Sequence, residues 1–240
     1  QKPENNFRVC KLFIDNCSVR YLTIPTNGSL EDRMLSYMET VLPKNPNTFF
    51  RLVFSIDGIG DNHDEARSMP GSYEKIIESY NSISALRNRF SNFILDANSV
   101  FTAKTENTLM DTLKHLHNNF EFDNLSVTFA RGDIKDASLK TKSEISYKKI
   151  NEYLESIQRK KEGRFLSPLF RSVNDVSRQN LMKTVFQDEF VAPCVAGRKL
   201  IIISETGNIY PCELLDRCLG NVRDTKFNVP AILKNSESID

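Results

Sequence analysis

Polar and glycine residues stand where four predicted strands end. The groups are Thr26-Asn27-Gly28, Ser55-Ile56-Asp57-Gly58, Asn98 with Thr102, and Arg131-Gly132-Asp133. Glycine lets the backbone pass close to a ligand, and hydroxyls, amides and carboxylates offer donors and acceptors to a polar small molecule. Each group taken singly is an ordinary loop start or helix cap. Their recurrence predicts a ligand site along one edge of a sheet.

Two cysteines flank a glycine near the C-terminal end. Twelve residues separate Cys194 from Gly207, and four separate Gly207 from Cys212. A hairpin turn at the glycine would bring both thiolates to one side. The alternative is that both are small buried hydrophobic residues. Glu213 follows directly and is either a base or a residue that caps or pairs within the hairpin.

Alternating strands and helices must position the first set of residues. Apolar patterning predicts strands about every 30 to 40 residues with a helix between each pair; the strands are 20–24, 49–56, 93–102 and 125–129. Connections of this length predict parallel strands, as in a doubly wound sheet or a β/α barrel, where functional residues lie at the carboxyl ends. Ser72 is expected to cap the helix that follows the second strand.

The pattern changes beyond residue 130. A long helix is predicted from 144 to about 163, a second over 173–186, and a hairpin from 199–204 and 208–210. The chain has 240 residues with 32 basic and 31 acidic side chains, so its charge favours neither nucleic acid nor an anionic membrane as partner. No apolar stretch approaches the ~20 residues that span a bilayer.

Five cysteines are an odd number for a disulfide framework, and the sequence opens at Gln1 without a signal peptide. These features favour a cytoplasmic, reducing setting and a chain cut from a longer one.

The strand ends resemble those of radical S-adenosylmethionine (SAM) enzymes. Ser55-Ile56-Asp57-Gly58, with the downstream His63-Asp64, Arg67 and Pro70-Gly71-Ser72-Tyr73, is similar to the fourth-strand segment of that family. Similar matches exist for the third, fifth and sixth strands, namely Thr26-Asn27-Gly28, Asn98 to Thr102 and Val127-Thr128-Phe129. The family fold is a partial (β/α)6 barrel. The resemblance therefore implies an α/β fold in which residues 1–135 supply the last four strands and the first two β/α units are missing.

The resemblance also implies a SAM site. Its members hold the methionine carboxylate with a serine and an arginine twelve residues later, which correspond to Ser55 and Arg67. A guanidinium suits a carboxylate because its planar fork can bind both oxygens. The alternative is that Arg67 is a surface arginine near a helix. Asp57 either shapes the turn or contacts a partner residue.

Two further residues at these strand ends, Asn27 and Asn98, are also candidates for cofactor binding. We expect His63 to cap the loop rather than to bind a ligand.

Cys194, Gly207 and Cys212 resemble the start of the auxiliary-cluster domain called SPASM or twitch. This implies that 191–240 begins such a domain after a helical linker at 136–190, with Cys194 and Cys212 as ligands of an auxiliary 4Fe-4S cluster. A cluster normally takes four thiolates, and the remaining ones are expected past Asp240. Relatives that oxidise a sulfatase cysteine have an aspartate where Glu213 stands, so that activity is not transferred.

The Cys-x3-Cys-x2-Cys motif that binds the SAM-cleaving 4Fe-4S cluster in this family is absent. We therefore expect the chain alone to be inactive. The preferred hypothesis is an oxidoreductase that, as an intact parent, cleaves SAM to a 5′-deoxyadenosyl radical. The radical then modifies a peptide or protein side chain, with an electron donor such as a flavodoxin or ferredoxin.

A small-molecule substrate remains open, and two other hypotheses compete. One is a metal-independent β/α-barrel lyase that uses Asp57, His63 and Arg67. The other is a non-enzymatic peptide-binding module.

Overall fold

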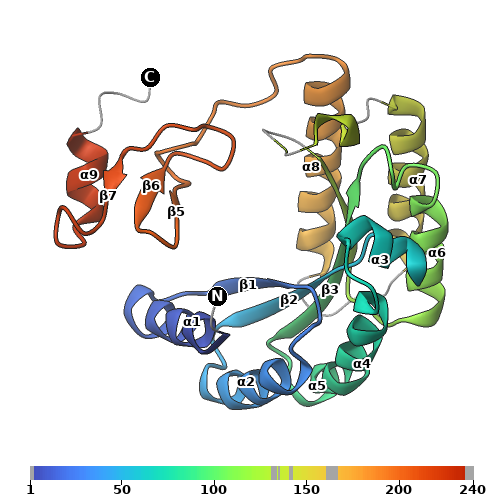
Figure 1. Ribbon diagram of the computed structural model, residues 1–240, viewed down its shortest axis with the longest axis horizontal. Coiled ribbons are helices and arrows are strands. Elements are labelled where there is room, and N and C mark those ends of the chain that lie inside the picture. Colours follow the sequence, from blue (N-terminus) through green and yellow to red (C-terminus); the bar gives the residue numbers. More distant parts are fainter. Residues whose placement is uncertain (1–2, 131–133, 135, 141–142, 161–166, 236–240) are drawn as a thin grey trace. The chain divides into compact units, whose positions relative to one another are not determined.

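The computed structural model describes residues 3–130, 134, 136–140, 143–160 and 167–235. The chain forms two compact units (Figure 1). Unit 1 comprises residues 1–130 and 138–171, and unit 2 comprises residues 131–137 and 172–240. Each unit has its own sheet.

Unit 1 alternates strands and helices, as the sequence predicts. Its elements in chain order are α1 (Pro3–Cys17), β1 (Tyr21–Thr26), α2 (Glu31–Lys44), β2 (Phe49–Ser55), α3 (Asp61–Arg67), α4 (Ser72–Ser84), α5 (Leu86–Arg89), β3 (Phe93–Phe101), α6 (Leu109–Asn119), β4 (Leu125–Phe129) and α7 (Glu144–Lys160), with a short 3-10 helix at Ala137–Leu139 on the boundary with unit 2. The predicted strands at 20–24, 49–56, 93–102 and 125–129 are confirmed within a few residues.

The four strands of unit 1 are parallel and follow the order β1-β2-β3-β4. Each is joined to the next through at least one helix, as parallel neighbours require. The prediction of an α/β fold with a parallel sheet is therefore confirmed. All four carboxyl ends lie at the same edge of the sheet.

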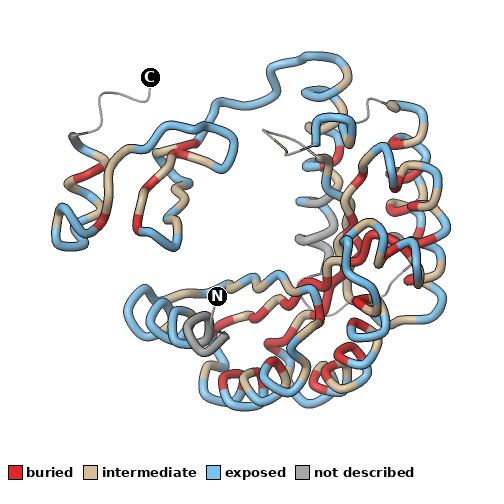
Figure 2. Tube along the Cα trace, viewed as in Figure 1, coloured by how far each residue is buried: buried red, intermediate tan, exposed pale blue. Residues whose placement is uncertain are grey.

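The two faces of this sheet differ in polarity. One face carries Phe50, Leu52 and Phe54 of β2 and Phe93 and Leu95 of β3, all with no exposed surface (Figure 2). Full burial of side chains of this size contributes about 1.5–3 kcal/mol each, so this face is the core of the unit. Figure 1 shows α2, α4 and α5 along the sheet.

The opposite face of the sheet is more polar. It bears Arg51 and Ser55 of β2 and Asp96 and Asn98 of β3, because successive side chains of a strand point to opposite sides. Arg51, Ser55 and Asn98 are half-buried, whereas Asp96 is fully buried beside Arg51.

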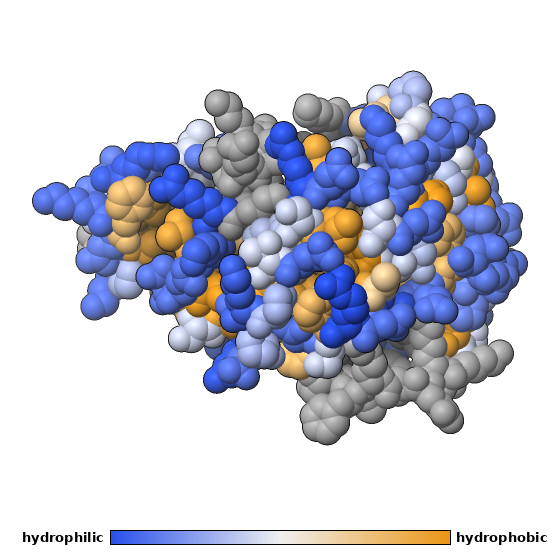
Figure 3. Space-filling model, turned by 90° about the horizontal axis from the view of Figure 1, so that it is seen from below, coloured by the Kyte–Doolittle hydropathy of each residue, from blue (hydrophilic) through white to orange (hydrophobic). Residues whose placement is uncertain are grey.

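Helix α7 also belongs to unit 1. Its Tyr147 is 1% exposed, and its ring centroid lies 5.5 Å from that of Phe101 and 5.2 Å from that of Phe129. The segment 136–190, interpreted from the sequence as a linker, is thus divided between the two units. The solvent side of the helices is largely hydrophilic (Figure 3). Across the described ranges, no helix combines the length and apolar character that crossing a membrane needs.

Unit 2 contains a small antiparallel sheet. Its elements are the later part of α8 (Ser167–Phe186), β5 (Ile202–Ile203), β6 (Asn208–Tyr210), β7 (Gly220–Asn221) and α9 (Val229–Asn235). Strands β5 and β6 form the predicted hairpin, and β7, which the sequence did not indicate, adds to β6. Gly207 occupies the turn with a φ of 88°, a conformation that side chains rarely adopt. Ile209, Val222 and Ile232 form the core of the unit.

Candidate functional site

The polar groups predicted to share one edge do so in the structure. Thr26, the last residue of β1, pairs with Phe54 on β2, and Ser55, the last residue of β2, pairs with Asn98, so these residues lie side by side; β3 continues to Phe101. Asn27 follows directly after β1. The fourth predicted group, Arg131-Gly132-Asp133, lies outside the described residues. The carboxyl edge of the sheet in unit 1 is therefore the candidate site.

Arg67, the last residue of α3, points back to the end of β2. Its Nη2 lies 2.8 Å from Oδ2 of Asp57, two residues after Ser55. The Asp57 side chain is 8% exposed and that of Arg67 is 33% exposed, so the guanidinium is still accessible to a ligand. The other Asp57 oxygen, Oδ1, accepts the backbone N–H of Val100 at 2.7 Å. Asp57 thus shapes the turn and also contacts a partner residue, the two roles left open by the sequence.

His63 stabilises the same turn. It is 1% exposed, and its Nδ1 accepts the backbone N–H of Asp57 at 3.1 Å, as expected for a residue that caps the loop. Burial lowers its pKa, and the charge of Arg67 lowers that pKa further. The turn can approach α3 this closely only because residue 58 is glycine: a Cβ there would lie 2.6 Å from the backbone nitrogen of His63. The turn therefore packs directly against α3.

Asp64 stabilises the start of α4, a role that the sequence analysis missed. Its carboxylate accepts the backbone N–H groups of Gly71 and Tyr73, the latter at 2.8 Å, and the Ser72 hydroxyl at 2.9 Å. These bonds, chiefly the one from Tyr73, lower the pKa of Asp64. The cap predicted for Ser72 is wrong: Gly71 occupies the N-cap position, and the Ser72 hydroxyl donates a hydrogen bond to Asp64 instead.

Asn98 and Asn27 lie at the edge but already have local partners. Asn98 donates from Nδ2 to Oγ1 of Thr128 at 3.1 Å and accepts from Oγ of Ser126 at 2.9 Å. Oδ1 of Asn27 accepts from the backbone N–H of Ser29 at 3.2 Å and from its hydroxyl at 2.8 Å. Both side chains therefore support the strand ends, and their part in cofactor binding stays a prediction.

Ser55 differs from the two asparagines. Within the ranges that the structure describes, its hydroxyl has no hydrogen-bond partner, and the residue is half-buried on the polar face. The hydroxyl of Ser55 at the end of β2 and the guanidinium of Arg67, whose side chain is one-third exposed, are thus both accessible to a ligand. A hydroxyl and a guanidinium can both donate hydrogen bonds to a carboxylate. The role of Ser55 and Arg67 in binding the methionine carboxylate of SAM, which the resemblance implies, stays a prediction.

The cysteine site is less complete. Cys194 is exposed and Cys212 is half-buried. Their segments are joined by the hydrogen bond from the Gly197 N–H to the Pro211 carbonyl, at 3.0 Å. Among the described residues, no group of three or more His, Cys, Asp or Glu side chains could hold a metal ion. A four-ligand cluster therefore does not fit the described residues, and the ligand roles of Cys194 and Cys212 stay predictions.

Glu213, which follows Cys212, is exposed. Its predicted role as a base stays a prediction.

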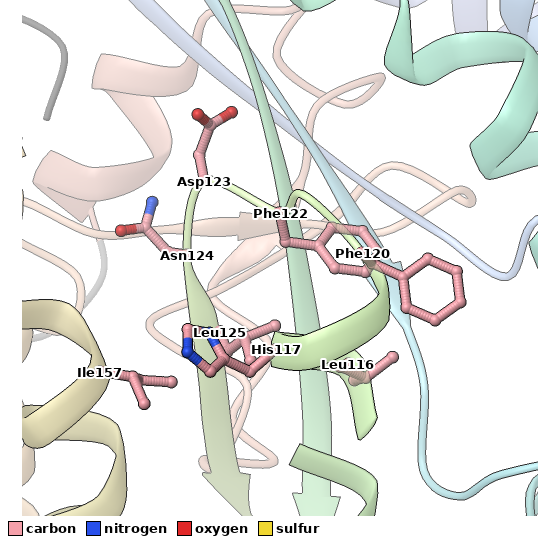
Figure 4. Close-up of a pocket in the computed structure, with 8 residues that line it drawn as sticks. All are labelled: Leu116, His117, Phe120, Phe122, Asp123, Asn124, Leu125 and Ile157. Atoms are coloured by element: carbon pink, nitrogen blue, oxygen red, sulfur yellow. The ribbon is translucent and has the colours of Figure 1, made fainter. Parts of the chain in front are cut away.

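Two cavities of unit 1 lie at the opposite, amino edge of the sheet. The first is lined by residues that include His117 of α6, Leu125 of β4 and Ile157 of α7, whose side chains come together, whereas Asp123 points away (Figure 4). It has room for about one water molecule. The second is an open depression near Val19 and Thr48, which precede β1 and β2. Neither cavity includes a residue of the candidate site.

Comparisons with known proteins agree with the fold. No protein-family model matches the sequence, and no curated protein matches it. Solved structures do match: that of native anSMEcpe with bound AdoMet (S-adenosylmethionine) has 18% identity and a TM-score of 0.54 over 90% of this chain. Native anSMEcpe with AdoMet and the Kp18Cys peptide gives 17% identity, the same TM-score and the same coverage.

The matched anSMEcpe is an anaerobic sulfatase-maturating radical SAM enzyme. The chain spans only 57% of the length of these two structures. At this level of identity the comparison concerns the fold alone. The α/β arrangement of this chain, with its parallel four-stranded sheet, is similar to part of a radical SAM structure.

Proposed function

We propose that this chain holds SAM within a radical SAM oxidoreductase that modifies a peptide or protein side chain. The observation that carries the proposal is the ion pair between Arg67 and Asp57, which brings a guanidinium to the strand end that carries the free Ser55 hydroxyl. The similarity to solved structures with bound AdoMet supports it.

In this proposal the two side chains bind the methionine carboxylate of SAM. The Ser55 hydroxyl donates one hydrogen bond, and the Arg67 guanidinium donates from the N–H groups that Asp57 does not use. Hydrogen bonds between ionised groups are about twice as strong as neutral ones, and partial burial at the strand end reduces screening by water. The contribution of these residues is to bind and orient SAM at the carboxyl edge of the sheet.

The cluster chemistry is not assigned to residues of this chain. In radical SAM enzymes a 4Fe-4S cluster supplies the electron that cleaves SAM, and the sequence contains no Cys-x3-Cys-x2-Cys motif to bind it. Cys194 and Cys212 are proposed as two ligands of an auxiliary cluster at the start of a SPASM-like domain, and Glu213 as a neighbouring base. Because two thiolates do not complete a site, no reaction step is derived from them.

The substrate class is proposed by analogy. Two of the similar solved structures contain a bound peptide, Kp18Cys in one and Cp18Cys in the other. A peptide or protein side chain is therefore the preferred substrate, and an exogenous electron donor would be needed.

Calorimetric titration of the chain with SAM at neutral pH tests the proposal. We expect saturable binding that Ser55→Ala and Arg67→Ala each weaken by about 1–3 kcal/mol, the range for a lost hydrogen bond to a charged group. Arg89→Ala is the matched control, because Arg89 forms an exposed pair with Glu39 on another part of unit 1 and should leave the affinity unchanged. Equal affinity in the wild type and in both site variants would reject the assignment.

A further inference from the structure

Asp57, in the turn between β2 and α3, interacts with two side chains of α3. Asp57 binds Arg67 through its carboxylate and His63 through its backbone N–H. The carboxylate also accepts the N–H of Val100, which fixes it against β3. The position of Arg67 therefore depends on Asp57, and the position of Asp57 depends on the acceptor that His63 provides.

The acceptor role of His63 requires a neutral ring. An imidazole accepts a hydrogen bond only through a nitrogen without a proton, whereas a protonated ring has two donors and no acceptor. Burial lowers the pKa of His63 and so does the charge of Arg67, while Asp57 and Asp64 act in the opposite direction. The ring is therefore neutral in the folded chain at neutral pH.

A second histidine, His115, is linked to His63 through Tyr73. Tyr73 of α4 has its ring centroid 6.1 Å from that of His63, and its hydroxyl lies 3.1 Å from Nε2 of His115 on α6. A control for the role of His63 must therefore include a substitution of His115.

We propose that His63 is a positioning residue that acts through Asp57, so that Arg67 is held in place for an anionic ligand only while the His63 ring is neutral. For the SAM carboxylate, this inference rests on the function proposed above. Protonation would put an N–H of the ring opposite the N–H of Asp57 and would add a cation beside the carboxylate that binds Arg67. The turn would lose a hydrogen bond, and Arg67 would lose its fixed position.

The first test uses no SAM. Nuclear magnetic resonance of the 15N-labelled chain follows the backbone amide of Asp57 and the guanidinium signals of Arg67 from about pH 7.5 downward. The titration continues below the range in which unperturbed histidines titrate, because burial and Arg67 lower the pKa of His63. We expect both sets of signals to shift with the midpoint of the His63 ring itself. Arg67 signals that do not follow His63 would overturn the inference.

The second test measures SAM affinity over the same pH range. We expect the wild type to bind about tenfold more weakly at the acidic end, as for the loss of a hydrogen bond to a charged group. His63→Asn keeps an acceptor near the position of Nδ1 without titrating, so its affinity should match the wild type at neutral pH and fall less in acid. His63→Phe keeps a ring without an acceptor and should bind about tenfold more weakly throughout.

His115→Asn is the matched control, because it removes the second histidine and should leave the wild-type pH profile intact. A profile that disappears in His115→Asn, or that persists in His63→Asn, would overturn the role of His63. The absence of SAM binding at every pH would reject the proposed function instead, and the positioning of Arg67 would still be decided by the magnetic resonance titration.

Discussion

Two ion pairs of unit 1 hold their charges in different surroundings. Asp57 holds Arg67 at the strand end, where one-third of the arginine side chain is exposed. Asp96 holds Arg51 on the polar face of the sheet, and the Asp96 side chain has no exposed surface. The first pair leaves donors for a ligand. The second isolates a carboxylate from water, which costs free energy unless the charge is compensated.

Removing Arg51 should therefore be strongly destabilising. Arg51→Ala leaves the Asp96 carboxylate buried with only the two hydrogen bonds from Asn124, at 2.9 and 3.0 Å. We expect the free energy of unfolding in urea to fall by about 3–5 kcal/mol, as for other broken buried pairs. Arg89→Ala, which breaks an exposed pair, should cost at most about 1 kcal/mol.

A second substitution distinguishes two causes of the stability loss in Arg51→Ala, namely the buried charge of Asp96 and the lost packing of the arginine side chain. Adding Asp96→Asn to Arg51→Ala should restore part of the lost stability, because the buried group is then neutral. If Arg51→Ala is no more costly than Arg89→Ala, the account of a buried and uncompensated charge is wrong.

Residue types and spacing predicted the candidate site in part. The strand-end groups containing Ser55 and Asn98 and the twelve-residue spacing to Arg67 were visible in the sequence. Asp57 was expected either to shape the turn or to contact a partner residue. The sequence did not distinguish these roles, because the contact of Asp57 with Val100 joins residues 43 positions apart. Asp64 was missed for a similar reason: a helix is usually capped by an adjacent residue, and Asp64 caps α4 from the preceding helix.

At the scale of elements, the junction between β2 and α3 depends on one close approach. A Cβ at Gly58 would lie 2.6 Å from the backbone nitrogen of His63 and 2.8 Å from the carbonyl carbon of Asn62. Backbone atoms cannot rotate away as a side chain can. A side chain at position 58 would therefore force the turn that carries Asp57 away from the helix that carries Arg67.

Gly58→Ala should therefore destabilise the chain by about 1–3 kcal/mol, the usual cost of overpacking, and should also weaken SAM binding. Gly71→Ala is the control: a Cβ there meets nothing within 4 Å, so only its φ of 74° opposes alanine, at a cost of about 1–2 kcal/mol. The two variants are compared by urea unfolding and by calorimetry. A Gly58→Ala chain with unchanged stability and affinity would contradict the importance of this contact.

Periodicity predicted the longer elements of unit 1, whereas the short elements β7 and α3 were missed. The strands of unit 1 alternate with helices of 11 to 14 residues in α2, α4 and α6, which are long enough for a periodic pattern to be read. β7 has two residues and α3 has seven, so neither carries a readable pattern. These short elements depend on tertiary contacts, such as the hydrogen bond from Val222 to Gly207 that supports β7.

At the scale of the whole molecule, the comparisons concern the fold. The α/β fold with its parallel four-stranded sheet is similar to part of the solved anSMEcpe structures, with TM-scores from 0.53 to 0.55 over 90% of the chain. The sequence predicted this architecture because parallel strands need crossover helices. The assignment of α7 to unit 1 was not predictable, since it depends on Tyr147 packing between Phe101 and Phe129.

A crystal structure of the chain with SAM tests the central claim most directly. We expect the methionine carboxylate at the carboxyl edge of the sheet, with one oxygen about 3 Å from the Ser55 hydroxyl and the carboxylate about 3 Å from the Arg67 guanidinium, which keeps its contact with Asp57. SAM bound at the amino edge, or at the carboxyl edge with its carboxylate away from both side chains, would contradict the account.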